Sequence, residues 1–226
     1  MSSKIGIGIT TFNRASVLEK MLSKNTPAFK DKVVMISDDG STDSTKEVLQ
    51  KFDFPWITGP NIGVAGNKNR LFFQLQDCDF IFMADDDVLV SSGFEEIYLK
   101  AFKASGIHHF TYSPPGKHWG RCLGETIFGE VVIQHTRLDG GAFSFYTKEV
   151  LDACGGYNSW SHRDHSERIW RCGLVGKEKI NHIKGSEVLV KLMSVPSSVV
   201  KEGRNFFKRF EKSVWESMWK DKFCWM

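Results

Sequence analysis

The chain has 226 residues, 41% of them hydrophobic and 25% charged, which is enough to bury one sizeable core. Lysine and arginine outnumber aspartate and glutamate by 30 to 27, so the overall charge gives no case for nucleic-acid binding. The five cysteines lack CxxC spacing, which argues against a disulfide scaffold or a zinc site and favours a reduced, cytoplasmic protein. Neither a secretion signal nor an apolar stretch of about 18–20 residues is visible, so we expect no leader and no membrane-spanning stem.

The first half of the chain alternates short apolar segments with amphipathic ones. We expect strands around residues 5–9, 33–37 and 79–84, and helices over residues 15–24, 42–52 and 64–75. This order indicates an α/β fold with a mostly parallel sheet flanked by helices. Ligands of such sheets bind beyond the carboxyl ends of the strands, so the residues that follow each strand are the first candidates for a site.

The second half of the chain is less regular. We expect a long loop over residues 108–129, strands over 130–135 and 142–147, and a helix over 166–172. Residues 199–226 carry aromatic and apolar side chains at helical spacing among lysines and arginines, which predicts a C-terminal amphipathic helix. We predict one domain of residues 1–226, with halves of about 1–105 and 106–195 and a helical tail from about 196.

Polar residues follow each of the three early strands. The three loops contain Thr10, Thr11, Phe12, Asn13 and Arg14; Asp38, Asp39, Gly40 and Ser41; and Asp85, Asp86 and Asp87. An Asp-Asp-Gly-Ser segment is by itself a competent turn and helix start. Three adjacent carboxylates repel one another, however, and a hard divalent cation such as Mn²⁺ or Mg²⁺ resolves that conflict. We prefer this metal interpretation of Asp85–Asp87 to a solvated acidic turn.

Four segments in this order resemble the signature blocks of GT-A glycosyltransferases, especially those of family 2. They are residues 9–14, 36–43, 61–70 and 82–88, and the resemblance extends over about residues 4–175. It implies a GT-A fold and transfer of a sugar from a nucleotide-sugar donor, by default a UDP-sugar, to a glycan, protein or lipid-linked acceptor. The first half would then bind the donor, and the second half would bind the acceptor and supply catalysis.

The resemblance also assigns roles to individual residues. Residues 139–158 resemble the segment bordering the transferred sugar, and an aspartate of the second block hydrogen-bonds the nucleotide base in the family. The implied donor-binding residues are Thr10, Thr11, Phe12, Arg14, Asp38, Asp39, Arg70, Asp85, Asp86, Gly140 and Gly141. The implied Mn²⁺ or Mg²⁺ ligands are Asp87 and Asp85, with His182 as a further candidate; a lone histidine is more often structural.

The chain departs from the family where the general base belongs. Family members usually place Glu-Asp before a helix, and here those positions hold Ser161 and His162. Asp164 is the best substitute base, with His162 and His165 as rivals, although Asp164 could equally cap the helix. Because residues 166–173 also resemble retaining N-acetylgalactosaminyltransferases, inversion or retention at the anomeric carbon stays open.

Two other functional classes and two roles of the tail stay open as well. Asp85-x-Asp87 resembles the nucleophile motif of haloacid dehalogenase-type phosphatases, but Leu89 stands where those enzymes have Thr or Val. The missing Glu-Asp pair would suit a non-catalytic nucleotide-sugar-binding module. The basic amphipathic tail would pack on the core, form a homodimer, or contact a membrane surface as a peripheral protein.

Overall fold

The structure is a computed structural model that describes residues 3–112, 122–136, 141–158 and 162–195. For residues 162–164 it describes the backbone only. Its strands are β1 (Ile5–Thr11), β2 (Val33–Asp38), β3 (Trp56–Thr58), β4 (Phe80–Asp85), β5 (Val88–Val90), β6 (His109–Thr111), β7 (Cys122–Phe128), β8 (Val131–Thr136), β9 (Phe143–Thr147), β10 (Asn181–Ile183) and β11 (Val190–Leu192). Its helices are α1 (Ala15–Asn25), η1 (Thr26–Phe29), α2 (Thr45–Leu49), α3 (Gly63–Gln74), α4 (Phe94–Ser105), α5 (Lys148–Cys154), α6 (His162–Arg171) and η3 (Ser186–Val188).

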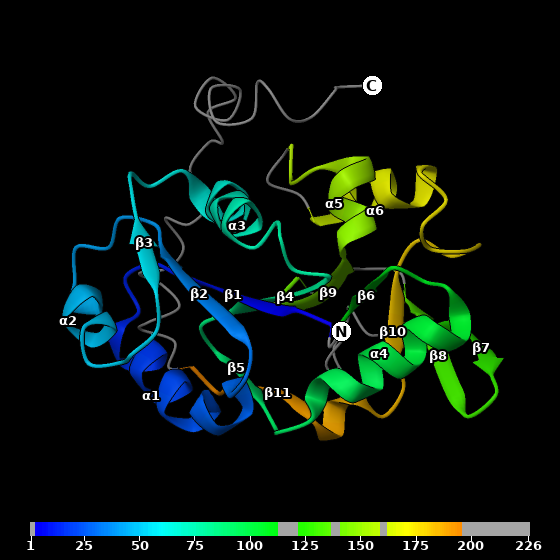
Figure 1. The fold of residues 1–226 in the computed structure, drawn as a ribbon, viewed down its shortest axis with the longest axis horizontal. Coiled ribbons are helices and arrows are strands. Elements are labelled where there is room, and N and C mark those ends of the chain that lie inside the picture. The colour runs from blue at the N-terminus through cyan, green and yellow to red at the C-terminus, as the bar shows by residue number, and fades with distance from the viewer. Residues whose placement is uncertain (1–2, 113–121, 137–140, 159–161, 196–226) are drawn as a thin grey trace.

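A six-stranded sheet in the order β3-β2-β1-β4-β9-β6 forms the centre of the molecule. Strands β3, β2, β1 and β4 pair in parallel, whereas β9 runs antiparallel to both β4 and β6. Helices α3, α5 and α6 lie on one face of this sheet, and α1 and α4 lie on the other (Figure 1). The prediction of a mostly parallel α/β sheet flanked by helices, as in the GT-A fold, is confirmed.

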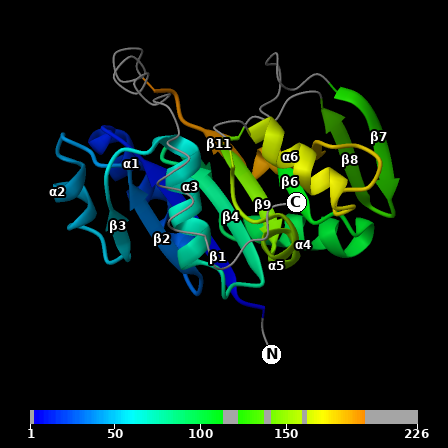
Figure 2. The same cartoon turned by 90° about the horizontal axis from the view of Figure 1, so that it is seen from above.

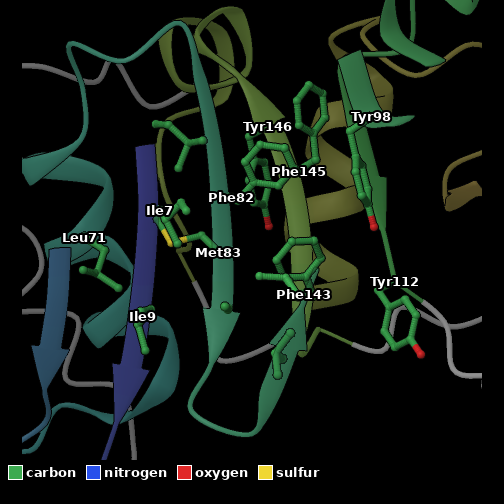
Figure 3. Close-up of a cluster of buried hydrophobic side chains, with 14 of the residues drawn as sticks. Ile7, Ile9, Leu71, Phe82, Met83, Tyr98, Tyr112, Phe143, Phe145 and Tyr146 are labelled. Atoms are coloured by element: carbon green, nitrogen blue, oxygen red, sulfur yellow. The ribbon is translucent and has the colours of Figure 1, made fainter. Parts of the chain in front are cut away.

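The glycines of β1 let a helix approach the sheet closely. A Cβ atom on Gly8 would lie 2.7 Å from Met83 Sδ and 3.1 Å from Leu71 Cβ, which is closer than packed side chains come. Leu71 of α3 therefore rests directly over β1, next to the side chains of β4 (Figure 3). This contact fixes the height of α3 above the sheet, and α3 carries several polar side chains of the site described below.

An aromatic cluster fills the opposite face of β4, between the sheet and α4. Phe82 packs edge-on against Phe94 and Tyr98 of α4, with ring centroids 5.0 and 5.4 Å apart. It also contacts Phe143 and Phe145 of β9 at 5.7 and 5.2 Å (Figure 3). Burial of each such ring contributes about 1.5–3 kcal/mol, so this cluster stabilises the packing of β4 and β9 against α4.

Two smaller sheets complete the fold. Strands β10, β8 and β7 form an antiparallel sheet, which lies at the opposite end of the molecule from α2 and β3 (Figure 2). Strand β11 pairs with β5, the strand that directly follows the third aspartate of the acidic loop. Met193, the residue after β11, donates a backbone hydrogen bond of 2.7 Å from its N to Asp87 O. Within the residues described, no helix is both long and apolar enough to cross a membrane.

Several predictions about the second half were wrong. The expected loop over residues 108–129 contains β6 and β7, and the expected helix over 166–172 begins four residues earlier, at His162. In the first half, the expected helix over 42–52 is shorter because Asp43 Oδ1 accepts hydrogen bonds from the backbone N and hydroxyl of Thr45 and so starts the helix there. The predicted C-terminal helix lies outside the described residues, and the division into halves stays a prediction.

Candidate functional site

The three loops predicted to carry chemistry converge at one edge of the sheet. β1 lies between β2 and β4, with Thr11 opposite Asp38 and Thr10 opposite Asp85. Because these strands are parallel, their carboxyl ends and the residues that follow them meet at the same edge. The sequence thereby brings the Thr-Thr, Asp-Asp-Gly-Ser and triple-aspartate segments together in one place.

Arg14 contacts two of the three adjacent aspartates. Its Nη1 lies 2.7 Å from Asp86 Oδ1 and its Nη2 lies 2.8 Å from Asp87 Oδ2, while Thr11 donates a 2.7 Å hydrogen bond to Asp86 Oδ2. Both oxygens of Asp86 are therefore engaged inside the protein, and its side chain is only 2% exposed. Burial raises the pKa of Asp86 to about 7, although Arg14 and the Thr11 hydroxyl act in the opposite direction.

A buried lysine contacts the first aspartate. Lys68 of α3 places its Nζ 3.1 Å from Asp85 Oδ1 and 2.7 Å from the backbone oxygen of Gly141, and Thr10 donates to the same Asp85 Oδ1 at 3.3 Å. Loss of water around the Asp85 carboxylate raises its pKa, and the Lys68 ammonium opposes that rise. Asp85 N also donates to Ala142 O at 2.8 Å, so the acidic loop is bonded to residues 141–142 through both backbone and side chain.

The three aspartates thus differ in what they can do. The side chains of Asp85 and Asp87 are 29% and 22% exposed, whereas that of Asp86 is buried. Carboxylate oxygens are the ligands that Mg²⁺ and Mn²⁺ prefer, so the alternate pair Asp85 and Asp87 fits a divalent cation. Over the part of the chain that the structure describes, no group of three His, Cys, Asp or Glu side chains is clustered closely enough to hold a metal alone.

Asp39 lies at the N-terminus of α3. Its carboxylate accepts hydrogen bonds from the backbone N of Ile62 and of Gly63 at 3.0 and 2.9 Å, and Arg70 Nη1 lies 3.2 Å from its Oδ1. Burial nevertheless raises the pKa of Asp39 to about 6. Arg70, itself 8% exposed, also donates to Pro60 O at 2.6 Å. This residue, predicted to bind the nucleotide-sugar donor, therefore joins α3 to the loop that precedes it.

The neighbouring Asp38 orders its own loop. Its carboxylate accepts bonds from the backbone N of Ser41 at 3.1 Å and from the Thr58 hydroxyl at 2.8 Å. Asn13 adopts a positive φ of 50°, and its side chain accepts a 2.7 Å bond from Thr42 N, which joins the first loop to the second. Phe12 of the first loop, which was predicted to bind the donor, is buried at 8% exposure.

The acceptor half is described less completely. Gly141 lies at the site through its carbonyl, whereas Gly140 is outside the described residues. Asp164 is the third residue of α6, but its side chain lies outside the described part of the structure, as does that of His162. His165 is 1% exposed and packs against Tyr157 and Tyr146 at 4.3 and 5.7 Å, so this rival for the general base belongs to the core.

His182, the further candidate metal ligand, lies on β10 and is 4% exposed. Its Nδ1 is 3.2 Å from the backbone oxygen of Thr111, and its Nε2 is 3.7 Å from Glu187 Oε2. Burial lowers its pKa, which favours the neutral ring. Its role as a metal ligand stays a prediction, and the contacts of its side chain are to Thr111 of β6 in the six-stranded sheet and to Glu187 of η3.

Lys68 was not identified from the sequence as a functional residue, although a signal was present. Residues 67–70 are four consecutive polar residues in a predicted helix. Four residues complete a turn of an α-helix, so at least one of them must face the sheet. All four are in fact buried, since α3 is covered by the sheet, the loop at residues 59–62 and the 155–157 turn.

Comparisons with known proteins agree with this arrangement. The model of glycosyl transferase family 2 matches residues 7–127, which is more than half of the chain. An uncharacterized glycosyltransferase of Acanthamoeba polyphaga mimivirus is 28% identical over 194 residues, covering 76% of this chain and 75% of that protein. The GalNAc(5)-diNAcBac-PP-undecaprenol beta-1,3-glucosyltransferase of Campylobacter jejuni is 37% identical over 106 residues, but the match covers only 43% of this chain and 34% of that protein.

Solved structures share the fold at low sequence identity. The mannosyltransferase PcManGT of Pyrobaculum calidifontis, solved with GDP-Man and Mn²⁺, superposes with a TM-score of 0.59 at 14% identity, over 83% of this chain and 60% of that one. Glucosyl-3-phosphoglycerate synthase of Mycobacterium tuberculosis, solved with Mn²⁺, UDP and phosphoglyceric acid, gives 0.57 at 14% identity, over 91% and 76%. At this identity the likeness concerns the fold.

Proposed function

Because the chain belongs to glycosyl transferase family 2, it is a glycosyltransferase, and we propose that it transfers a sugar from a nucleotide-sugar donor to an acceptor hydroxyl with a divalent metal at Asp85 and Asp87. The observation that carries this proposal is the difference in burial and contacts among the three aspartates. Asp86 is buried and held by Arg14 and Thr11, while its two neighbours keep exposed oxygens at the open edge of the sheet. Membership of this family argues against the phosphatase alternative.

The residues around the acidic loop suit a metal-bound diphosphate. A divalent cation held by Asp85 and Asp87 would neutralise the two phosphates of the donor and the charge that develops on the leaving group. Mn²⁺ is the metal named with both solved neighbours, and Mg²⁺ has the same preference for oxygen. In this proposal an aspartate of the pair Asp38 and Asp39 hydrogen-bonds the nucleotide base, Gly140 and Gly141 border the sugar, and UDP is the default nucleotide.

The transfer step needs a base for the acceptor. The acceptor oxygen attacks the anomeric carbon of the sugar, the bond from that carbon to the phosphate oxygen breaks, and the nucleoside diphosphate leaves. Asp164 is the proposed recipient of the acceptor's hydroxyl proton, because it lies in the first turn of α6 close to the family's usual base position. His165 cannot take this role from its place among Tyr146, Tyr157 and Phe72.

The acceptor is proposed only as a class: a glycan, a protein or a lipid-linked saccharide. The Campylobacter relative acts, by its name, on an undecaprenol-linked saccharide, and a basic amphipathic tail would suit such an acceptor at a membrane surface. Packing of the tail on the core or in a homodimer is the alternative, and residues 196–226 lie outside the described structure.

A thermal-shift screen of nucleotide sugars with and without Mn²⁺ tests the proposal directly. A donor that binds the folded state at 100 times its Kd stabilises it by about 2.7 kcal/mol, so the correct donor stands out from the others. Metal-dependent hydrolysis of that donor, lost in Asp87→Ala and kept in the surface variant Asp152→Asn, is the expected result. Binding without turnover would indicate a non-catalytic module, and no shift with any donor would contradict the proposal.

A further inference from the structure

Lys68 is the least exposed cationic side chain among the described residues, at 1% exposure. A lysine ammonium loses much of its hydration energy on burial unless anionic or carbonyl partners replace the water. Here the partners are Asp85 Oδ1 at 3.1 Å and Gly141 O at 2.7 Å. These two partners belong to different parts of the site, since Asp85 ends β4 in the donor half and Gly141 precedes β9 in the acceptor half.

The contact from Lys68 also orients the Asp85 carboxylate. Lys68 and Thr10 both bond to Oδ1 of Asp85, from α3 and from β1 respectively. These two bonds to the same oxygen restrict the rotation of the carboxyl group. The Asp85 side chain, which is 29% exposed, is therefore held in one orientation toward solvent. The same ammonium holds the Gly141 carbonyl, next to the Asp85 N to Ala142 O bond of 2.8 Å.

We propose that Lys68 is a positioning residue that acts through Asp85 and Gly141: it orients the Asp85 carboxylate for the divalent metal and holds the backbone of Gly141 against the acidic loop. This inference rests on the proposed function. Lys68 does not need to touch the donor, because its ammonium is enclosed by protein. Loss of such a supporting contact typically lowers metal affinity by about 10- to 100-fold.

Calorimetric titration of Mn²⁺ into the full chain, with UDP present, tests this inference. We expect Lys68→Met to weaken Mn²⁺ binding by about tenfold or more. Asn69→Ala is the matched control. Asn69 is the next residue of α3 and is equally buried, but its side chain bonds to the backbone O and N of Tyr157 at 2.8 and 2.7 Å, and neither bond involves an aspartate. It should lower the melting temperature and leave the Mn²⁺ affinity of the folded protein unchanged.

A double-mutant cycle separates positioning from a general loss of stability. If Lys68 acts on the metal through Asp85, adding Lys68→Met to Asp85→Asn weakens Mn²⁺ binding little beyond Asp85→Asn alone. If Lys68→Met does not fold, Lys68→Gln, which keeps a donor for the Gly141 carbonyl but loses the charge, is measured instead. Mn²⁺ affinity equal to wild type in the folded variant, or full additivity with Asp85→Asn, would overturn the inference. Failure of the wild-type protein to bind Mn²⁺ and UDP would instead contradict the proposed function.

Discussion

The two predicted halves of the molecule position their candidate site residues in different ways. In the donor half, the polar side chains follow parallel strands, and they are positioned by bonds to one another, as Arg14 is by Asp86 and Asp87. In the acceptor half, the strands pair antiparallel, and the candidate base stands on a helix that follows residues 159–161, which are outside the described structure. The donor residues can therefore be predicted from a sequence motif, whereas the base and the acceptor residues lack such a motif in this chain.

The largest expected effect falls on the acceptor half. Asp164→Asn should lower kcat for transfer by about 10²- to 10⁴-fold and leave donor affinity unchanged, because a general base contributes that much and does not hold the nucleotide. Steady-state kinetics with a measured donor Kd would check both values. Glu167→Gln, on the same helix but paired outward with Lys179, is the control and should keep wild-type kcat. Full activity of Asp164→Asn would mean that the base lies elsewhere.

The joint between the halves comes next. A Cβ on Gly156 would overlap Asn69 Oδ1, which bonds to Tyr157 N across the joint. Gly156→Ala should therefore destabilise the protein by about 1–3 kcal/mol, as overpacking of a buried contact does. Urea unfolding measures this change. Gly124→Ala on β7, where an added Cβ meets nothing within 4 Å, should change stability far less; equal effects would show that Gly156 does not couple the halves.

The buried carboxylate of Asp39 makes the donor half sensitive to pH. Burial raises its pKa to about 6, above the ordinary value of an aspartate, so the folded state binds a proton more tightly than the unfolded state. The contribution of Asp39 to stability is thus present below about pH 4 and is lost as pH rises through about 6. The unfolding free energy of Asp39→Asn minus that of wild type should therefore increase by about 2 kcal/mol as the pH rises from 4 to 7.

Denaturant unfolding at several pH values checks the Asp39 prediction, with Asp152→Asn at an exposed site as the control. A constant difference between Asp39→Asn and wild type across this pH range would argue against a buried, protonated carboxyl. The sign is informative by itself, because an aspartate held mainly by its Arg70 contact would lose stability at low pH instead.

The smallest effect is expected at the far end of the acceptor half. Ile127 on β7 is 69% exposed, so Ile127→Thr should change the unfolding free energy by less than about 0.5 kcal/mol and leave donor binding intact. Thermal unfolding and the donor shift assay check this together. A loss of several degrees in Tm would mean that β7 is covered by another part of the chain or by a second copy.

The sequence allowed prediction of the elements whose pattern is long and regular. The strands at residues 5–11 and 80–85 and the helix at 63–74 were predicted within a few residues. The strand at 80–85 reads as a continuous apolar run, as buried parallel strands do, and the strand at 5–11 shows isoleucines that alternate with glycines. The three-residue strands β3, β5, β6, β10 and β11 were missed, since three residues show no period. Residues 94–105 form α4, which went unassigned although its apolar side chains recur at helical spacing.

Within the site, residue identity could be predicted better than residue contact. The aspartates and Arg14 were assigned from the motif, but the sequence did not reveal that Arg14 bonds to Asp86 and Asp87 rather than standing open at the edge. That pairing depends on how β1 and β4 lie side by side, 75 residues apart in the chain. Long-range register of this kind is set by tertiary packing, which local patterns do not encode.

The hydrogen bond from Met193 N to Asp87 O has a consequence for biosynthesis. The aspartates are synthesised early, but β11, which pairs with β5 directly after them, is made about a hundred residues later. Closing so long a loop is slow and entropically costly, so the acidic loop acquires its last support only after most of the chain has left the ribosome. A nascent chain that stops at residue 127 would hold every aspartate of the motif and still lack the bond from Met193 N to Asp87 O.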